Sequence, residues 1–320
     1  MNTTILFVVV LLLSLSLASA AVAQSSDVAH DTWSSGKPMP KAILGTAAAV
    51  LGKRIIVVGG ETSDGKGTAD TYIYNPDANT WSKGVPLPTP IVWSTAAVVN
   101  NVLYVIGGED DTDTIGTNAV WAFDLQTKTW IPKSPMPTAR GQEVAVVEKN
   151  NTIYVIGGAI WYARFNNVES YDPATDTWTE ETPLPVAECN LTGGLIGTRI
   201  VVADGYNDSL GSGDNESYNP FTKAWTKGTP DPTPRNASCG GAIGTQLYVA
   251  GGYNTAGWSY SLTESLDRST NTWTRLADMP QRTVFPASAV YNGKLYCFGG
   301  IDDWGVSGAN VLNNVQIYQP

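Results

Sequence analysis

The residue types that most often build active sites are scarce in this chain of 320 residues. It has one histidine, His30, and three cysteines, Cys189, Cys239 and Cys297. A Ser-His-Asp triad would have to use His30 as its base, and a zinc site needs histidines or cysteines that cluster. The sequence therefore argues against a histidine-dependent hydrolase and a zinc centre, and we assign no catalytic residue.

The cysteine count also bears on stability. An odd number of cysteines excludes a fully paired set of intramolecular disulfides. Because cysteines are sparse in this chain, we expect them to be mostly buried small apolar residues. We therefore predict that the structure depends on packing rather than on disulfides.

Carboxylates offer the remaining chemistry. The run from Glu109 to Asp113 carries oxygen atoms of the kind that calcium prefers, but it lacks the spacing of an EF-hand loop. We therefore predict no metal site and no cofactor.

A repeat of nearly constant length organises the whole chain. Tryptophans recur every 47 to 49 residues, at Trp33, Trp81, Trp130, Trp178, Trp225 and Trp273. Paired glycines recur in phase with them, at 59–60, 107–108, 157–158, 251–252 and 299–300. The missing pair falls on Asp204 and Gly205, and a large apolar residue precedes five of the tryptophans by seven positions.

Each repeat reads as four short strands. In the first, small and β-branched runs at 44–51, 54–58 and 71–74 are separated by turn signals, and Trp81 begins a fourth strand. No stretch has a sustained helical period. A four-stranded blade cannot bury both of its faces alone, whereas blades packed around an axis can.

These units resemble the kelch repeat, and the resemblance covers nearly all of the chain after its first residues. The departures are Asp204 for glycine, Phe123 and Leu266 for tyrosine, and two extra residues in the turn at 149–151. The resemblance implies an all-β, six-bladed propeller formed by residues 24–320 as a single domain. Trp33 lies in an N-terminal segment that we expect to supply the fourth strand of the last blade and so to close the ring.

The N-terminus and the charge limit the location and the partners. Residues 5–17 are almost entirely apolar and precede two small-residue cleavage motifs, which predicts a signal peptide at 1–23 and a secreted protein, extracellular or periplasmic. The run of about 13 residues is shorter than the ~20 that span a bilayer, so we expect no membrane insertion of the mature chain. The net charge of −10 argues against a nucleic-acid partner.

Long loops on one face of the propeller carry the candidate ligand-binding residues. Aromatic side chains gather in the loops of the third to sixth repeats, and exposed aromatic residues are typical of binding hot spots. We select Trp161, Tyr162, Tyr253 and Trp258 from them. The apolar segment 160–165 is unusual for a solvated loop, which favours Trp161 and Tyr162.

The inner rim of the channel supplies the other candidates. The residue fourteen positions before each glycine pair is Gly45, Trp93, Asn190, Ala237 or Phe285, and Gly141 takes this place in the third repeat, beside Arg140. The kelch resemblance implies that this rim contacts the ligand, which makes Trp93, Arg140, Asn190 and Asp204 candidate binding residues. Two alternatives stay open here. Trp93 and Phe285 could fill the channel instead of binding a ligand, and Asp204 could be a substitution in the repeat that has no function.

We interpret the protein as a non-catalytic extracellular binding module whose long-loop face binds a glycan or an extracellular protein. The alternative, which the kelch resemblance allows, is a sugar-modifying enzyme of the mutarotase or epimerase type. It would use Asp204 or Glu188 beside an arginine at the channel mouth. The copper oxidases that share this fold need histidine ligands, and this chain has only His30.

Overall fold

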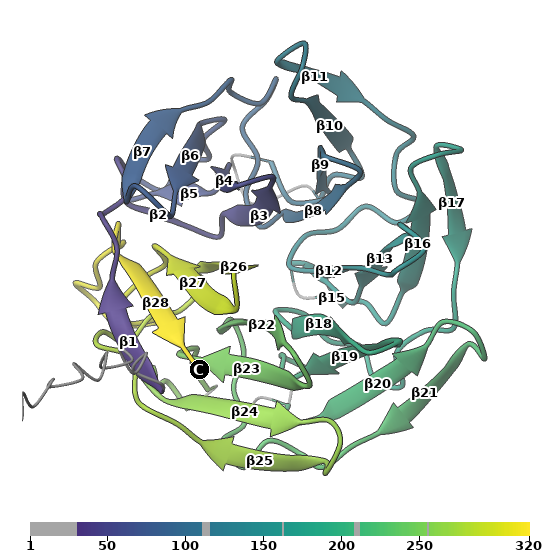
Figure 1. The fold of residues 1–320 in the computed structure, drawn as a ribbon, viewed down its shortest axis with the longest axis vertical. Helices are drawn as coiled ribbons and strands as arrows, with labels where there is room; N and C mark the ends of the chain where they lie inside the picture. Colours follow the sequence, from purple (N-terminus) through teal and green to yellow (C-terminus); the bar gives the residue numbers. More distant parts are fainter. Residues whose placement is uncertain (1–30, 111–115, 162, 208–211, 255) are drawn as a thin grey trace, which may run out of the picture.

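The protein is a ring of six four-stranded antiparallel sheets around a central axis (Figure 1). The structure is a computed structural model that describes residues 31–320 except 111–115, 162, 208–211 and 255. These described residues contain no helix, and hence none that could span a membrane. The predicted all-β, six-bladed propeller is confirmed. The predicted signal peptide lies outside the described residues.

In each blade the strands are given in order from the central axis to the outer edge of the ring. Blade 1 consists of β3 (Ala47–Leu51), β4 (Arg54–Val58), β6 (Thr71–Asn75) and β7 (Thr80–Lys83). Blade 2 consists of β8 (Thr95–Val99), β9 (Val102–Ile106), β10 (Val120–Asp124) and β11 (Thr129–Pro132). Blade 3 consists of β12 (Val144–Val147), β13 (Ile153–Ile156), β16 (Val168–Asp172) and β17 (Thr177–Glu180).

The second half of the ring repeats this order. Blade 4 consists of β18 (Thr192–Ile196), β19 (Arg199–Ala203), β20 (Asn215–Asn219) and β21 (Ala224–Lys227). Blade 5 consists of β22 (Cys239–Ile243), β23 (Gln246–Ala250), β24 (Thr263–Asp267) and β25 (Thr272–Arg275). Blade 6 consists of β26 (Ala287–Tyr291), β27 (Lys294–Phe298), β28 (Val315–Gln319) and β1 (Thr32–Ser35). Two short ladders lie outside the blades, β2 (Ile43–Leu44) with β5 (Glu61–Thr62) and β14 (Ala159–Ile160) with β15 (Ala163–Arg164).

The two ends of the chain close the ring. Strand β1 pairs antiparallel with β28, and Trp33 lies opposite Tyr318. Figure 1 shows the purple β1 beside the yellow β28. The predicted closure by the N-terminal strand is therefore confirmed.

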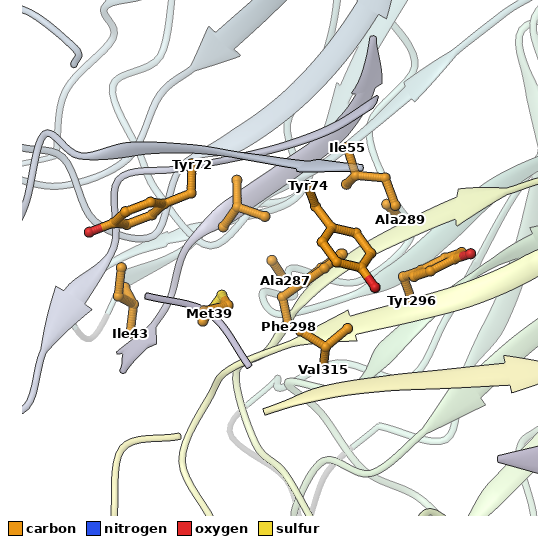
Figure 2. Packing of buried hydrophobic residues seen from close by; sticks show 11 residues of the cluster. Met39, Ile43, Ile55, Tyr72, Tyr74, Ala287, Ala289, Tyr296, Phe298 and Val315 are labelled. Atoms are coloured by element: carbon orange, nitrogen blue, oxygen red, sulfur yellow. The ribbon is translucent and has the colours of Figure 1, made fainter. Parts of the chain in front are cut away.

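The repeated tryptophans hold neighbouring blades together. The indole N–H of each donates a hydrogen bond of 2.8–3.0 Å to a carbonyl in the segment that leaves the preceding blade. Between blades 6 and 1, Tyr74 packs edge-on against Phe298 and Tyr296, and Met39 and Val315 complete this apolar cluster (Figure 2). Burial of aromatic side chains contributes a large share of the core's stability, so the tryptophan of each repeat is an informative sign of the contact between neighbouring blades.

A disulfide also joins two blades, so the prediction that the structure depends on packing alone is wrong. Cys239 at the start of β22 is bonded to Cys297 in β27, and both are buried. The two residues lie on adjacent strands of blades 5 and 6, a proximity that sequence spacing does not reveal. Cys189 lies outside this disulfide and is buried, as expected for all three.

Candidate binding site at the channel mouth

A closed ring of six backbone hydrogen bonds surrounds the mouth of the channel. Each blade gives one residue just before its innermost strand, and its N–H donates to the carbonyl of the equivalent residue in the preceding blade. The bonds measure 2.8–3.1 Å and link Gly45, Trp93, Gln142, Asn190, Ala237 and Phe285. All six residues have φ between 55° and 61°. Because these bonds satisfy the backbone, the side chains decide the chemistry of the mouth.

The sequence placed five of these six residues correctly. Gln142, not Gly141, occupies the position in blade 3. The turn between β12 and β13 holds one extra residue, not two, because the register pairs Val147 with Ile153.

The mouth opens into a cavity of about 210 Å³ whose two sides differ in chemistry. On one side, the rings of Trp93 and Phe285 pack edge-on, with 4.8 Å between their centroids. On the other side, the amide of Asn190 donates to Gln142 Oε1 at 3.1 Å, and Gln142 donates to buried Glu109 at 3.1 Å. An apolar wall thus faces a wall of fixed amides.

Aromatic residues extend the apolar wall over blades 5 and 6. The ring of Trp304 lies 4.8 Å from that of Phe285 and 6.3 Å from that of Tyr253. Trp304 is 37 % exposed, whereas Phe285 is buried. The loop before Trp304 is tied to the blade 5 loop by a hydrogen bond from Ser259 to Asp303. The result is an exposed aromatic surface on a buried aromatic base.

The other predicted aromatic residues lie farther out on the loops. Trp161 stands between β14 and β15 in blade 3 and is 59 % exposed, and Trp258 in the blade 5 loop is 68 % exposed. Tyr162 lies outside the described residues. Arg164 lies over the ring of Tyr206 at 4.3 Å, which places a cation–π contact between the loops of blades 3 and 4.

Arg140 and Asp204, two of the predicted site residues, have no exposed surface. Arg140 pairs with Glu169 at 2.6 Å. Asp204 lies 3.7 Å from Arg235, which also contacts Asp231 at 3.1 Å. Both arginines therefore hold loops against the third strands of their blades rather than face solvent.

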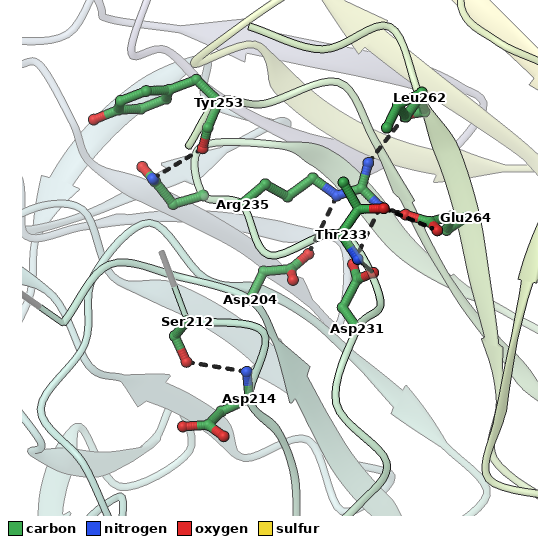
Figure 3. Close-up of polar contacts among 10 residues, drawn as sticks. Asp204, Ser212, Asp214, Asp231, Thr233, Arg235, Tyr253, Leu262 and Glu264 are labelled. Atoms are coloured by element: carbon green, nitrogen blue, oxygen red, sulfur yellow. Dashed lines mark hydrogen bonds and ion pairs between the residues drawn. The ribbon is translucent and has the colours of Figure 1, made fainter. Parts of the chain in front are cut away.

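Figure 3 shows the cluster around Arg235, in which Asp204, Asp231 and Glu264 surround one guanidinium. Burial raises the pKa of Asp204 well above its usual value, and the Asp231 carboxylate raises it further. Asp204 has φ of 61° at a position where five blades have glycine, a conformation that aspartate tolerates better than most residues. Its role in this structure is internal.

Blade 4 replaces the buried arginine with an acid. Glu188 occupies the position of Arg140 and Arg235, two residues before the rim, and Glu216 occupies the position of their glutamate partners. Burial raises the pKa of each to about 7, and the two carboxylates repel one another. Glu188 accepts a hydrogen bond of 3.0 Å from Asn207. These groups exchange protons near neutral pH, but both are almost fully buried.

A second unusual carboxyl group lies beside the rim in blade 3. Glu143 follows Gln142, contributes to the cavity wall and is 8 % exposed. Burial raises its pKa to about 8. Within residues 31–320, apart from the gaps, no three acidic, histidine or cysteine side chains converge in a way that could hold a metal ion. Part of the run at 109–113 lies outside the described residues.

The sequence did not single out three residues of the mouth. The rim alignment named Phe285 but left open whether it lines or plugs the channel, Trp304 was one aromatic among many loop residues, and the blade 3 turn led to Gly141 instead of Gln142. The offset from the glycine pairs did locate Phe285, and with one extra residue in the blade 3 turn it also gives Gln142. Only the loop conformation brings Trp304 to the rim.

Comparison with known proteins identifies the family. Residues 25–190 match the KLHDC2/KLHL20/DRC7 Kelch-repeats domain, and residues 234–280 and 282–320 match the Kelch motif. The first match covers more than half of the chain, so the protein belongs to the kelch-repeat family. The fold and this family define a binding or protein-interaction module.

A solved structure titled "Structure of YjhT" is similar in fold. It has a TM-score of 0.75 and 18 % sequence identity, and the match covers 88 % of this chain and 96 % of that one. Comparison with curated proteins finds no match. In all, 957 chains of solved structures match this fold, so the similarity shows the architecture and leaves the ligand to be argued from the site.

Proposed function

We propose that the protein is an exported, non-catalytic binding module that binds a glycan at the channel mouth. The observation that carries the proposal is the two-sided cavity, with Trp93 and Phe285 on one side and the amides of Gln142 and Asn190 on the other. A sugar ring has an apolar face that stacks on aromatic rings and hydroxyl groups that need fixed polar partners.

The size of the cavity indicates which part of a glycan enters it. About 210 Å³ is small beside the roughly 300–1,000 Å³ of most ligand pockets, which suits one sugar ring better than a chain. The following sugars would lie across Tyr253 and Trp304, with Trp258 or Trp161 farther out. The site therefore favours a terminal residue of a glycan.

Two observations support export of the chain. The apolar N-terminal segment has the pattern of a signal peptide. The disulfide between Cys239 and Cys297 is typical of an oxidising compartment outside the cytosol. Neither depends on what the mouth binds.

The alternative of a sugar-modifying enzyme needs a carboxylate and an arginine within reach of substrate. The pairs Asp204–Arg235 and Glu169–Arg140 exist, but all four residues are almost fully buried. Glu143 is the acid nearest the cavity, and none of the described residues of the cavity wall is an arginine. The Arg140 guanidinium acts on the Glu143 carboxyl group but is itself fully buried. The geometry thus favours binding over turnover.

A glycan array with matched variants tests the proposal. We expect the mature chain, residues 24–320, to bind a small set of glycans with a common terminal sugar. Trp304→Ala should weaken binding by about 30-fold or more, the usual cost of losing an aromatic hot spot, while the melting temperature changes little. Trp161→Ala tests the outer surface.

Phe221→Ala is the control, because Phe221 is an aromatic residue that is 95 % exposed in a turn between β20 and β21, on the opposite face. A blank array would overturn the glycan proposal. A pull-down from the extracellular fraction would then search for a protein ligand.

A further inference from the structure

Five Asn-x-Ser/Thr sequons follow the predicted signal peptide, and they differ in the hydrogen bonding of the asparagine side-chain nitrogen. In four of them this nitrogen donates a hydrogen bond inside the fold: Asn190 to Gln142, Asn207 to Glu188, Asn215 to Thr229 and Asn236 to Tyr253. Asn215 is 2 % exposed and Asn236 is fully buried. Folding thus uses the one atom that glycosylation would modify.

Asn150 is arranged differently. It is exposed, and its side-chain oxygen accepts a hydrogen bond of 2.9 Å from the backbone N–H of Thr152. This Asx turn employs the oxygen and leaves the nitrogen without a partner among the described residues. The hydroxyl-bearing residue of the sequon is thereby held two residues away in a fixed turn.

The turn that carries Asn150 is the one with an extra residue. The other inner turns, such as Asn100-Asn101 in blade 2 and Gly197-Thr198 in blade 4, are shorter and contain no sequon. The equivalent turns of the other blades are exposed too, so the insertion's contribution is to create the acceptor motif Asn150-Asn151-Thr152 at an exposed position.

We propose that Asn150 is the N-glycosylation site of the folded protein. The co-substrate would be an oligosaccharide carried on a lipid pyrophosphate, delivered by the transferase of a secretory pathway. The amide nitrogen forms a bond to C1 of the first sugar, the lipid pyrophosphate leaves, and the nitrogen gives up one proton. A glycan on Asn215 or Asn236 has no room in the fold, so chains modified there do not fold.

The position of Asn150 keeps such a glycan away from the ligand. Asn150 lies in the turn between β12 and β13, whereas the mouth lies at the start of β12, at the opposite end of that strand. The glycan would project from the face opposite the aromatic surface. The inference rests on export of the chain and not on the nature of its ligand.

The test uses the full chain produced in a eukaryotic secretory host. Secreted, monomeric protein is treated with a glycan-releasing amidase, which leaves aspartate where a glycan was attached, and peptide mass spectrometry locates it. We expect complete or major occupancy at Asn150 and none at Asn215 or Asn236. Asn150→Gln and Thr152→Ala should both abolish the glycan, and Lys149→Gln, an exposed neighbour outside the sequon, should retain it.

Secreted folded protein without a glycan at Asn150, or with one at Asn215 or Asn236, would overturn the inference. If the chain's own leader fails in this host, a host leader fused to residues 24–320 gives the same readout. The Asn150→Gln protein should bind the glycan array as the parent does. A blank array with a glycan at Asn150 would count against the proposed ligand alone.

Discussion

The hydroxyl of Ser259 in the blade 5 loop donates a 2.6 Å hydrogen bond to Oδ1 of Asp303 in the blade 6 loop. The same hydroxyl accepts the backbone N–H of Trp304 at 3.2 Å, and Arg282 pairs with the other oxygen of Asp303 at 2.8 Å. Three contacts therefore fix the segment that places Trp304 over Phe285. The blade 6 loop, which has little regular secondary structure here, is thus held in place by Ser259 and Arg282.

Removal of this tie should weaken ligand binding without unfolding the protein. Ser259→Ala deletes a hydrogen bond to a charged group, worth about 1.5–3 kcal/mol, part of which appears as lost order of Trp304. We expect affinity for an array-selected glycan to fall by roughly 10-fold, with the melting temperature lowered by no more than a few degrees. Calorimetric titration measures the affinity.

Asp302→Asn is the control, because the side-chain hydrogen bonds of Asp302 among the described residues stay within its own loop, to Asn310 at 2.8 Å. Equal affinity for Ser259→Ala and the parent would show that Trp304 needs no help from blade 5.

Closure of the ring by β1 should decide solubility. A chain that lacks residues 27–37 loses this strand and exposes the edge of β28, and open edges pair with other chains. It also loses the contact of Trp33 with Tyr318, whose rings lie 5.2 Å apart. We expect oligomers or aggregates in size-exclusion chromatography. A chain that begins at residue 29 and keeps β1 should remain monomeric, and a monomeric form of the longer deletion would contradict the prediction.

The disulfide should be a major source of stability. Cys239 and Cys297 are separated by 58 residues, and closing a loop of this length is worth about 4 kcal/mol in the chain-entropy account. The double variant Cys239→Ala, Cys297→Ala should lose about that much in urea unfolding. Cys189→Ala, which removes the cysteine outside the disulfide, is the control and should lose less. Titration of the denatured, unreduced protein should find one free thiol, and three would contradict the pairing.

The sequence predicted the fold because the markers of the ring are local and periodic. Each tryptophan makes the same bond to the preceding blade, so one residue per repeat carries the information. The rim was predictable for a similar reason, since it lies at a constant offset from the glycine pair. One insertion in the turn after β12 was enough to shift the assignment from Gln142 to Gly141.

The rest of the site depends on contacts that occur once and do not recur from repeat to repeat. Nothing in the spacing of Ser259 and Asp303 indicates that their loops meet. The same holds for Cys239 and Cys297, which lie on an innermost strand and a second strand of neighbouring blades. Arg140 and Asp204 looked available to a ligand because the sequence gives position along the chain and not depth. Packing alone decided that both are buried.

Buried acids should make the protein less stable as the pH rises. The folded-state pKa values of Glu188 and Glu216, about 7, exceed the usual value of 4.5, so the folded state holds protons that the unfolded chain releases. The stability from these groups is fully present below about pH 4.5 and is lost as the pH rises through 7. Glu143, with a pKa of about 8, extends the loss to that pH.

Other carboxylates act in the opposite direction at lower pH. Hydrogen bonds to Asp176 and Asp267 hold the pKa of each below 3.8, so their stability is lost in acid. We therefore expect the urea midpoint to be highest near pH 5 and to fall between pH 5 and 8. The double variant Glu188→Gln, Glu216→Gln should flatten the curve up to pH 7, and Glu143→Gln should flatten it near pH 8. Glu180→Gln, an exposed change on β17, should preserve the parent's curve. A midpoint that rises from pH 5 to 8 would mean that these acids are ionised in the folded state and have partners there.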